Sequence, residues 1–163
     1  MFAYEQLGVK PDIITSAKAL GCGVPVGAFA ATEKVALAFE PGDHGTTYGG
    51  NPFVTAAVNE VFNLFESEKI LDNVKNVTPY LEEALDGLVK KYDFIIERRG
   101  MGFMQGLEFS IPVKDLIPKI MESGLILISA GTNVIRFVPP LIISKENVDE
   151  MIQKFDNCLS EIK

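Results

Sequence analysis

Residues 12–17, DIITSA, form a short stretch rich in strand-forming residues, and Lys18 follows them directly. This stretch predicts a β-strand that ends in a turn, residues 19–23 (ALGCG), containing two glycines. Glycine lets the backbone approach a ligand closely, and an amine at a strand end is one way to present a nucleophile to a carbonyl compound. Lys18 is therefore a candidate Schiff-base lysine, although the local pattern alone favours a solvated surface lysine.

The composition excludes several classes of protein. Hydrophobic residues make up 47% of the 163 residues, which is enough to build a folded core. The net charge of −7 offers no basic surface for nucleic acid. No apolar run is long enough to span a bilayer, and residues 1–5 lack the basic and apolar stretches of a signal peptide. We therefore expect a cytoplasmic protein that binds neither nucleic acid nor membrane.

Cysteine and histidine are too few to predict a metal site or a disulfide framework. Cys158 falls on the apolar face of the last predicted helix, so we expect a small core residue there. Cys22 lies in the turn after Lys18, and His44 is the single histidine. No metal motif is present, and no metal ligand is expected.

The order of the expected elements indicates two lobes. A strand over residues 26–31 leads to a short helix over 32–39 with Thr32 as its N-cap, and Asn51-Pro52 is typical of a helix start. Apolar residues recur at helical spacing over 54–65, which predicts a well-buried helix.

A helix over residues 72–91, which Pro79 should kink or interrupt, leads into alternating short strands and helices. These are strands at 94–97, 103–109, 125–128 and 134–138, and helices at 113–121 and 145–162, the last capped by Ser144. We expect α/β material over residues 1–78 and a smaller α+β domain over residues 79–163.

Three further segments suggest chemistry, each with a structural alternative. Residues 45–50 (GTTYGG) precede a capped helix and have the ingredients of a phosphate site, but such clusters are usually caps and turns. Arg136 alternates with Ile135 and Phe137 on a short strand and needs an anionic partner, either a substrate or a protein carboxylate, the latter being favoured from the sequence alone. Arg98 and Arg99 adjoin three glycines, for which packing in a bulge or tight turn is the default role, the alternative being that the two arginines reach a nearby anionic site.

Together these segments resemble the C-terminal part of the class III aminotransferases, pyridoxal-phosphate enzymes of fold type I. The resemblance lies in residues 11–18 with 23–28, in 44–52, in 99–104 and in 135–141. It covers nearly the whole chain, with four motifs in the expected order. It is greatest to the members that act on N-acetylornithine, followed by those that act on ornithine.

The resemblance implies a role for each candidate residue. Lys18 would form the Schiff base with pyridoxal 5′-phosphate and move the proton during transamination. Thr47 would bind the cofactor phosphate from the neighbouring subunit of a homodimer, and Thr46 would line the substrate site. Arg136 would bind a carboxylate of the amino-acid or 2-oxo acid substrate. The implied reaction transfers the amino group of N-acetylornithine to 2-oxoglutarate in arginine biosynthesis.

The resemblance also implies that this chain is only the C-terminal portion of such an enzyme. Family members are more than twice as long, and their first half supplies the phosphate loop, the aromatic residue stacked on the ring and the aspartate that pairs with the ring nitrogen. We therefore expect the isolated chain to be incomplete. The alternatives are another ω-aminotransferase of the class, acting on ornithine or 4-aminobutyrate, and a non-catalytic dimerisation fragment of the fold.

Overall fold

The computed structural model describes residues 1–162 and divides the chain into two compact units. The first, here called the N-terminal unit, is Met1–Lys69, and the C-terminal unit begins at Ile70. Helix α4 spans Ile70–Lys91, and Pro79 does not interrupt it. The domain boundary expected after residue 78 therefore falls inside this helix.

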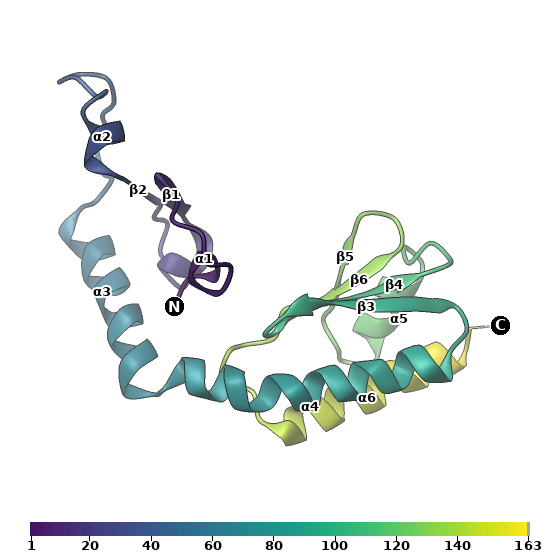
Figure 1. The fold of residues 1–163 in the computed structure, drawn as a ribbon. Coiled ribbons are helices and arrows are strands. Elements are labelled where there is room, and N and C mark those ends of the chain that lie inside the picture. Colours follow the sequence, from purple (N-terminus) through teal and green to yellow (C-terminus); the bar gives the residue numbers. More distant parts are fainter. Residues whose placement is uncertain (163) are drawn as a thin grey trace. The chain divides into compact units, whose positions relative to one another are not determined.

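The N-terminal unit is built on a two-stranded antiparallel sheet (Figure 1). Thr15 pairs with Phe29 in this sheet, and Ile13 pairs with Ala31. The two expected strands are thus confirmed, although both are shorter than predicted. The elements of the unit are α1 (Ala3–Gln6), β1 (Ile13–Ser16), the 3₁₀ turn η1 (Lys18–Leu20), β2 (Ala28–Ala31), α2 (Glu33–Ala36) and α3 (Pro52–Ser67).

Helix α3 begins as the sequence predicts. The Asn51 side chain accepts hydrogen bonds from the backbone N–H groups of Phe53, at 3.0 Å, and Val54, at 3.2 Å, and Pro52 is the first helical residue. Thr32 stands at the N-cap position of α2, but its side chain makes no capping hydrogen bond, contrary to expectation.

The expected burial of α3 is wrong for this chain. Val54 is its one fully buried residue, and Phe53 is 72% exposed. Helical spacing of apolar residues identifies a surface suited to burial, but it does not provide the element that covers that surface.

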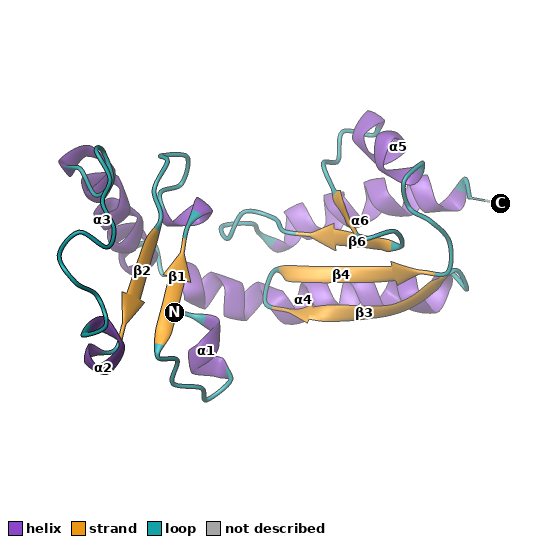
Figure 2. Ribbon diagram, turned by 90° about the horizontal axis from the view of Figure 1, so that it is seen from above, coloured by secondary structure: helices purple, strands orange, loops and turns teal. Residues whose placement is uncertain are grey.

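The C-terminal unit has two layers, a four-stranded antiparallel sheet and three helices. The strand order is β3-β4-β6-β5. Figure 2 shows β3, β4 and β6 side by side with α4 and α6 behind them. The elements after α4 are β3 (Ile95–Met101), β4 (Met104–Phe109), α5 (Leu116–Glu122), β5 (Ile128–Ala130), β6 (Val134–Phe137) and α6 (Lys145–Ser160).

The core of this unit lies between the helices and one face of the sheet. The apolar stripe expected along α4 is confirmed, since Leu81 and Leu85 are completely buried. Helix α6 starts with a capping box in which Ser144 and Asn147 bond reciprocally, as expected for a cap at Ser144. The buried side chains on the sheet and α6 include Leu107, Phe109, Ile135, Phe137, Val148, Phe155, Leu159 and, as predicted, the free thiol Cys158.

Candidate functional site

Lys18 stands where β1 ends and the 3₁₀ turn begins. Its backbone has a φ of +54°, a region that favours glycine and costs other residues about 1–2 kcal/mol. The turn is closed by hydrogen bonds from the Leu20 N–H to the Ala17 carbonyl and from the Gly21 N–H to the Lys18 carbonyl. The side chain is exposed, as the strand-end prediction requires. Cys22 and Lys69 also have positive φ, so the backbone conformation marks Lys18 as a candidate only together with its place at the strand end.

Gly21 fixes the path of the chain after Lys18. A Cβ atom at Gly21 would lie 2.5 Å from the Val24 carbonyl oxygen and 2.6 Å from Cγ1 of Val26. Any larger residue would therefore displace the turn that positions the lysine. Cys22, in the same turn, is a free and exposed thiol whose Sγ lies 3.4 Å from the Ala19 carbonyl oxygen.

Some polar groups of the loop before α3 form hydrogen bonds within the loop and with the helix cap. The Gly49 N–H donates to Oγ1 of Thr46 at 3.1 Å, and Nδ2 of Asn51 donates to the Tyr48 carbonyl at 2.7 Å. Because Asn51 also occupies the first N–H groups of α3, the helix end itself is capped rather than free for a phosphate. Thr47 is exposed, and its hydroxyl makes no hydrogen bond to any described residue.

Arg136 lies on the face of the sheet opposite the helices. Its neighbours Ile135 and Phe137 are completely buried on the core side, so the predicted alternation is confirmed. Arg136 itself is exposed, and no carboxylate of residues 1–162 forms an ion pair with it. The protein salt bridge favoured from the sequence alone is therefore not found in the described part of the chain.

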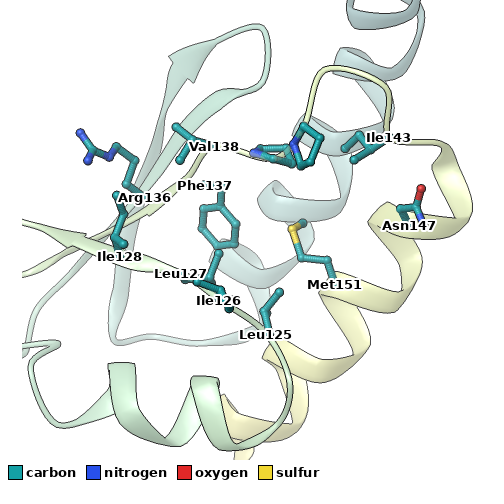
Figure 3. A pocket seen from close by; sticks show the side chains of 12 residues that line it. Leu125, Ile126, Leu127, Ile128, Arg136, Phe137, Val138, Ile143, Asn147 and Met151 are labelled. Atoms are coloured by element: carbon teal, nitrogen blue, oxygen red, sulfur yellow. The ribbon is translucent and has the colours of Figure 1, made fainter. Parts of the chain in front are cut away.

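An apolar hollow of about 320 Å³ adjoins Arg136. Figure 3 shows the guanidinium pointing away from the apolar side chains, with Phe137 and Met151 among those that line the hollow. The apolar hollow therefore adjoins the strand that carries Arg136, while the guanidinium itself is directed to the exposed side.

Arg98 and Arg99 have the packing roles expected by default. Nε of Arg98 lies 2.7 Å from Oδ1 of Asp86, and its Nη1 donates to Oε1 of Gln105 at 2.9 Å. Gln105 is buried and was not among the expected core residues, although its spacing from Leu107 along the strand places it on the core face. Arg99 pairs with Glu97 and Glu108.

The candidate residues are divided between the two units. Lys18, Thr46 and Thr47 belong to the N-terminal unit, and Arg136 belongs to the C-terminal unit. Within residues 1–162, no helix combines the length and apolar character needed to cross a membrane. No group of three or more Cys, His, Asp or Glu side chains in the same residues is placed to hold a metal ion.

Comparison with known proteins decides the family, since residues 1–159 match the family model described as "Aminotransferase class-III". The chain belongs to the class-III aminotransferases. The fold expected from the sequence, part of an aminotransferase large domain followed by a small α+β domain, is that of this family.

Two curated relatives with high identity are both acetylornithine aminotransferases. The chain is 47% identical to an acetylornithine aminotransferase of Gloeobacter violaceus over 164 residues, and 42% identical to one of Methanocaldococcus jannaschii over 167 residues. These matches cover 99% and 100% of the chain but only 41% of each relative. The chain thus spans about two fifths of the length of the curated relatives it matches.

Solved structures give the same relationship. The ornithine delta-aminotransferase of Plasmodium falciparum is 35% identical, with a TM-score of 0.89 over 96% of this chain and 42% of that chain. An acetylornithine aminotransferase of Elizabethkingia anophelis is 27% identical, with a TM-score of 0.89 over 98% of this chain and 41% of that chain.

Enzymes of this class use pyridoxal 5′-phosphate, and residues of the N-terminal unit fit part of that cofactor. The exposed amine of Lys18, in a strained turn that only glycine at Gly21 allows, suits an aldehyde. The free hydroxyl of Thr47 suits a phosphate oxygen.

Proposed function

We propose that this chain is the C-terminal portion of an aminotransferase that moves the amino group of N-acetylornithine to 2-oxoglutarate. The observation that carries the proposal is Lys18, an exposed lysine held at φ +54° at a strand end, in a chain up to 47% identical to acetylornithine aminotransferases. The whole enzyme, on this proposal, is a cytoplasmic homodimer that binds amino-acid and 2-oxo acid substrates.

The residues of this chain have separate tasks in that reaction. When bound, pyridoxal phosphate supplies a ring that accepts the electron pair released at the substrate's amine-bearing carbon. Nζ of Lys18 would hold the cofactor through its aldehyde group and, when free, would take the proton from the amine-bearing carbon of the substrate. The Thr47 hydroxyl would donate to the phosphate of the neighbouring subunit's cofactor, and Thr46 would line the substrate site beside it. Arg136 binds a substrate carboxylate through two parallel N–H groups.

A second candidate reaction uses ornithine as the amino donor. The likeness to the ornithine delta-aminotransferase of P. falciparum, at 35% identity, supports it. The test is to compare kcat/KM for N-acetylornithine, ornithine and 4-aminobutyrate in the full-length enzyme. The proposal requires N-acetylornithine to be the best donor, and a preference for either of the others would replace it.

The role of Lys18 has a direct chemical test. Borohydride reduction of the full-length enzyme with pyridoxal phosphate, followed by peptide mass analysis, should place the pyridoxyl group on Lys18. Lys10→Arg and Lys34→Arg are matched controls, since both lysines are exposed in the same unit, and they should retain the label. A label on Lys10 or Lys34 in the unaltered enzyme would contradict the assignment.

The 163-residue chain by itself should show no transaminase activity and at most weak binding of the cofactor. Lys18 and Thr47 contribute an amine and a hydroxyl, whereas the ring-stacking and ring-nitrogen partners belong to the part of the enzyme outside this chain. Transaminase assays of the isolated chain, with the full-length enzyme as reference, measure this. Full activity in the isolated chain would mean that the site is complete within these residues and would favour a revised set of cofactor ligands.

A further inference from the structure

On the open face of the four-stranded sheet, four residues that are paired from strand to strand form a row across all four strands. Arg99 on β3 pairs with Gly106 on β4, Gly106 pairs with Arg136 on β6, and Arg136 pairs with Ile128 on β5. Residues paired in this way point to the same face of a sheet. The two arginines therefore flank a position that has no side chain.

Glu108 lies between the same two arginines. It is two residues along β4 from Gly106 and pairs with Glu97 on one side and with Val134 on the other. Diagonal neighbours on one face of a sheet lie about 7–8 Å apart, within reach of long side chains. Glu108 is thus a diagonal neighbour of both Arg99 and Arg136, and it is the carboxylate nearest in register to Arg136 on this face.

The structure assigns Glu108 to Arg99. Nη1 of Arg99 donates to Oε2 of Glu108 and also to Oε1 of Glu97, the latter at 2.7 Å. The second oxygen of Glu108 accepts from Nδ2 of Asn133 at 3.3 Å. The hydrogen bond from Arg99 holds the pKa of Glu108 below its ordinary value. Both oxygens of Glu108 are therefore engaged, Oε2 by Arg99 on β3 and Oε1 by Asn133, which directly precedes β6, and neither is bound to Arg136.

Arg136 is the exception among the arginines of this chain. The sequence contains three, and Arg98 and Arg99 both form ion pairs within the C-terminal unit. Arg136 forms none with any residue of 1–162, although a carboxylate lies at the next diagonal position.

We propose that Arg99 is a positioning residue that holds Glu108 away from Arg136 and so keeps the Arg136 guanidinium free for a substrate carboxylate. The part about substrate rests on the function proposed above. The restraint of Glu108 by Arg99 is a property of the C-terminal unit and is testable without any activity.

The first test measures how fast phenylglyoxal modifies Arg136 in the 163-residue chain, by peptide mass analysis at pH 8. Free guanidinium groups react faster than those bound to carboxylates. Arg99→Gln removes the charged partner of Glu108 and leaves only the 3.3 Å hydrogen bond from Asn133, so Glu108 can turn toward Arg136. Modification of Arg136 should then slow by about threefold, the scale of an exposed ion pair. Arg99→Gln combined with Glu108→Gln should restore the original rate, because the competing carboxylate is gone.

Glu108→Gln alone separates this inference from a merely structural role. If the Arg99–Glu108 pair only stabilises the sheet, breaking it from either side should have the same effect. On our inference Glu108→Gln leaves Arg136 at least as reactive as in the unaltered chain. Slower modification of Arg136 in Glu108→Gln would overturn the inference, whether or not Arg99→Gln folds.

Lys91→Gln provides a matched control. The Lys91 ammonium lies 2.6 Å from Oδ2 of Asp156, so Lys91→Gln also removes one exposed ion pair, but on the helices rather than on the sheet. The rate at which Arg136 is modified should be unchanged in the Lys91→Gln chain. Unchanged modification in a folded Arg99→Gln chain would also overturn the inference.

The second test uses the full-length enzyme. Arg99→Gln should raise KM for 2-oxoglutarate by about threefold with kcat nearly unchanged, and the double variant should restore KM. Arg99→Gln could slow the modification of Arg136 as predicted and yet leave KM for 2-oxoglutarate unchanged. In that case Arg99 restrains Glu108 as inferred, but Arg136 does not bind the substrate carboxylate. That result rejects the substrate part of the inference while retaining the restraint.

Discussion

The two units use similar kinds of residues in different ways. The C-terminal unit packs helices against a sheet, and residues such as Leu85 and Phe109 are completely buried. In the N-terminal unit, Leu37 is 78% exposed and Phe29 is 50% exposed. The unit with the weaker core nevertheless carries Lys18, the residue proposed to do the chemistry. The number of apolar residues in a unit therefore does not tell whether they are buried in a core or exposed. They are buried where a second layer of secondary structure packs on the first.

The architecture of the N-terminal unit explains the difference. Two strands are too few to be stable in water without a layer packed on them. The rings of Phe39 and Phe29 are tilted by 30° with their centroids 5.6 Å apart, and Phe39 meets His44 edge-on at 5.4 Å. Beside them β1, β2 and α2 enclose an open apolar hollow of about 280 Å³. This small aromatic cluster is the nearest feature to a core in that unit.

The largest expected difference between the two units is in their thermal unfolding when each is made as a separate peptide. A peptide of residues 70–163 should unfold in one cooperative thermal transition, because its core is complete within the unit. A peptide of residues 1–69 should show no such transition. Circular dichroism at 222 nm during heating measures both. A cooperative transition in residues 1–69 would show that the N-terminal unit is stable without a covering layer and would remove the contrast.

Matched phenylalanines should differ by several kcal/mol. Phe109→Ala should lower the free energy of unfolding of the C-terminal unit by about 3–5 kcal/mol, because it leaves a cavity in a filled core. Phe29→Ala, at a half-exposed site, should change it by less than about 0.5 kcal/mol. Urea unfolding of the 163-residue chain followed by circular dichroism measures both. Equal losses would indicate that the two units unfold together.

Matched glycines should separate stability from function. A Cβ atom at Gly100, where φ is +153°, would lie 2.2 Å from the Met104 carbonyl oxygen, so Gly100→Ala should cost about 1–3 kcal/mol of stability. Gly21→Ala should leave the melting of the C-terminal unit unchanged but weaken pyridoxal phosphate binding in the full-length enzyme, because it displaces the turn at Lys18.

Gly87→Ala is the control for the glycine pair. Gly87 lies inside α4 with open space around it, so alanine there should stabilise the unit by about 0.5–1 kcal/mol. A destabilised Gly87→Ala would mean that substitution of any glycine in this unit is harmful, and the result at Gly100 would lose its meaning.

The smallest expected effect depends on pH. The hydrogen bond from Arg99 lowers the pKa of Glu108 in the folded state, so this pair contributes stability above the ordinary glutamate pKa. That contribution is lost as pH falls through the lowered pKa. The difference in melting temperature between the unaltered chain and Glu108→Gln should therefore shrink between pH 6 and pH 3.

In the N-terminal unit, Glu5→Gln is the substitution to compare with Glu108→Gln. Glu5, whose pKa is lowered by a hydrogen bond from the chain's terminal amine, pairs within a unit that lacks a core. Glu5→Gln should leave the melting temperature of the C-terminal unit unchanged at every pH. A pH-dependent shift in Glu5→Gln would again indicate that the units unfold together.

Local signals predicted most of the fold. The cap at Asn51, the apolar stripe of α4 and the alternation around Arg136 depend on neighbours a few residues away, and all three are confirmed. The strand expected at residues 125–128 instead begins at Ile128, and the apolar residues before it line the hollow beside Arg136 without pairing with another strand. Apolar character alone does not distinguish those two environments.

The candidate site was predictable only in part. The sequence identified Lys18, Thr46, Thr47 and Arg136 through family resemblance, and their assigned roles stay predictions. It did not identify the engagement of Glu108 by Arg99, since that depends on the register of β3 against β4. Strand register and the rotamers of long side chains are set by tertiary packing, which residue type alone does not report.

The packing of α6 against α4 has a consequence for how this chain folds during synthesis. Tyr80 donates to Asp149 at 2.6 Å, and Lys91 pairs with Asp156, contacts that join residues 69 and 65 positions apart. Because α6 supplies Val148, Phe155 and Leu159, the core stays open until the ribosome has released that helix. Such distant contacts form slowly. A nascent chain paused before residue 145 would therefore present the apolar stripe of α4 to chaperones, and the C-terminal unit would complete its core only after α6 has left the ribosome.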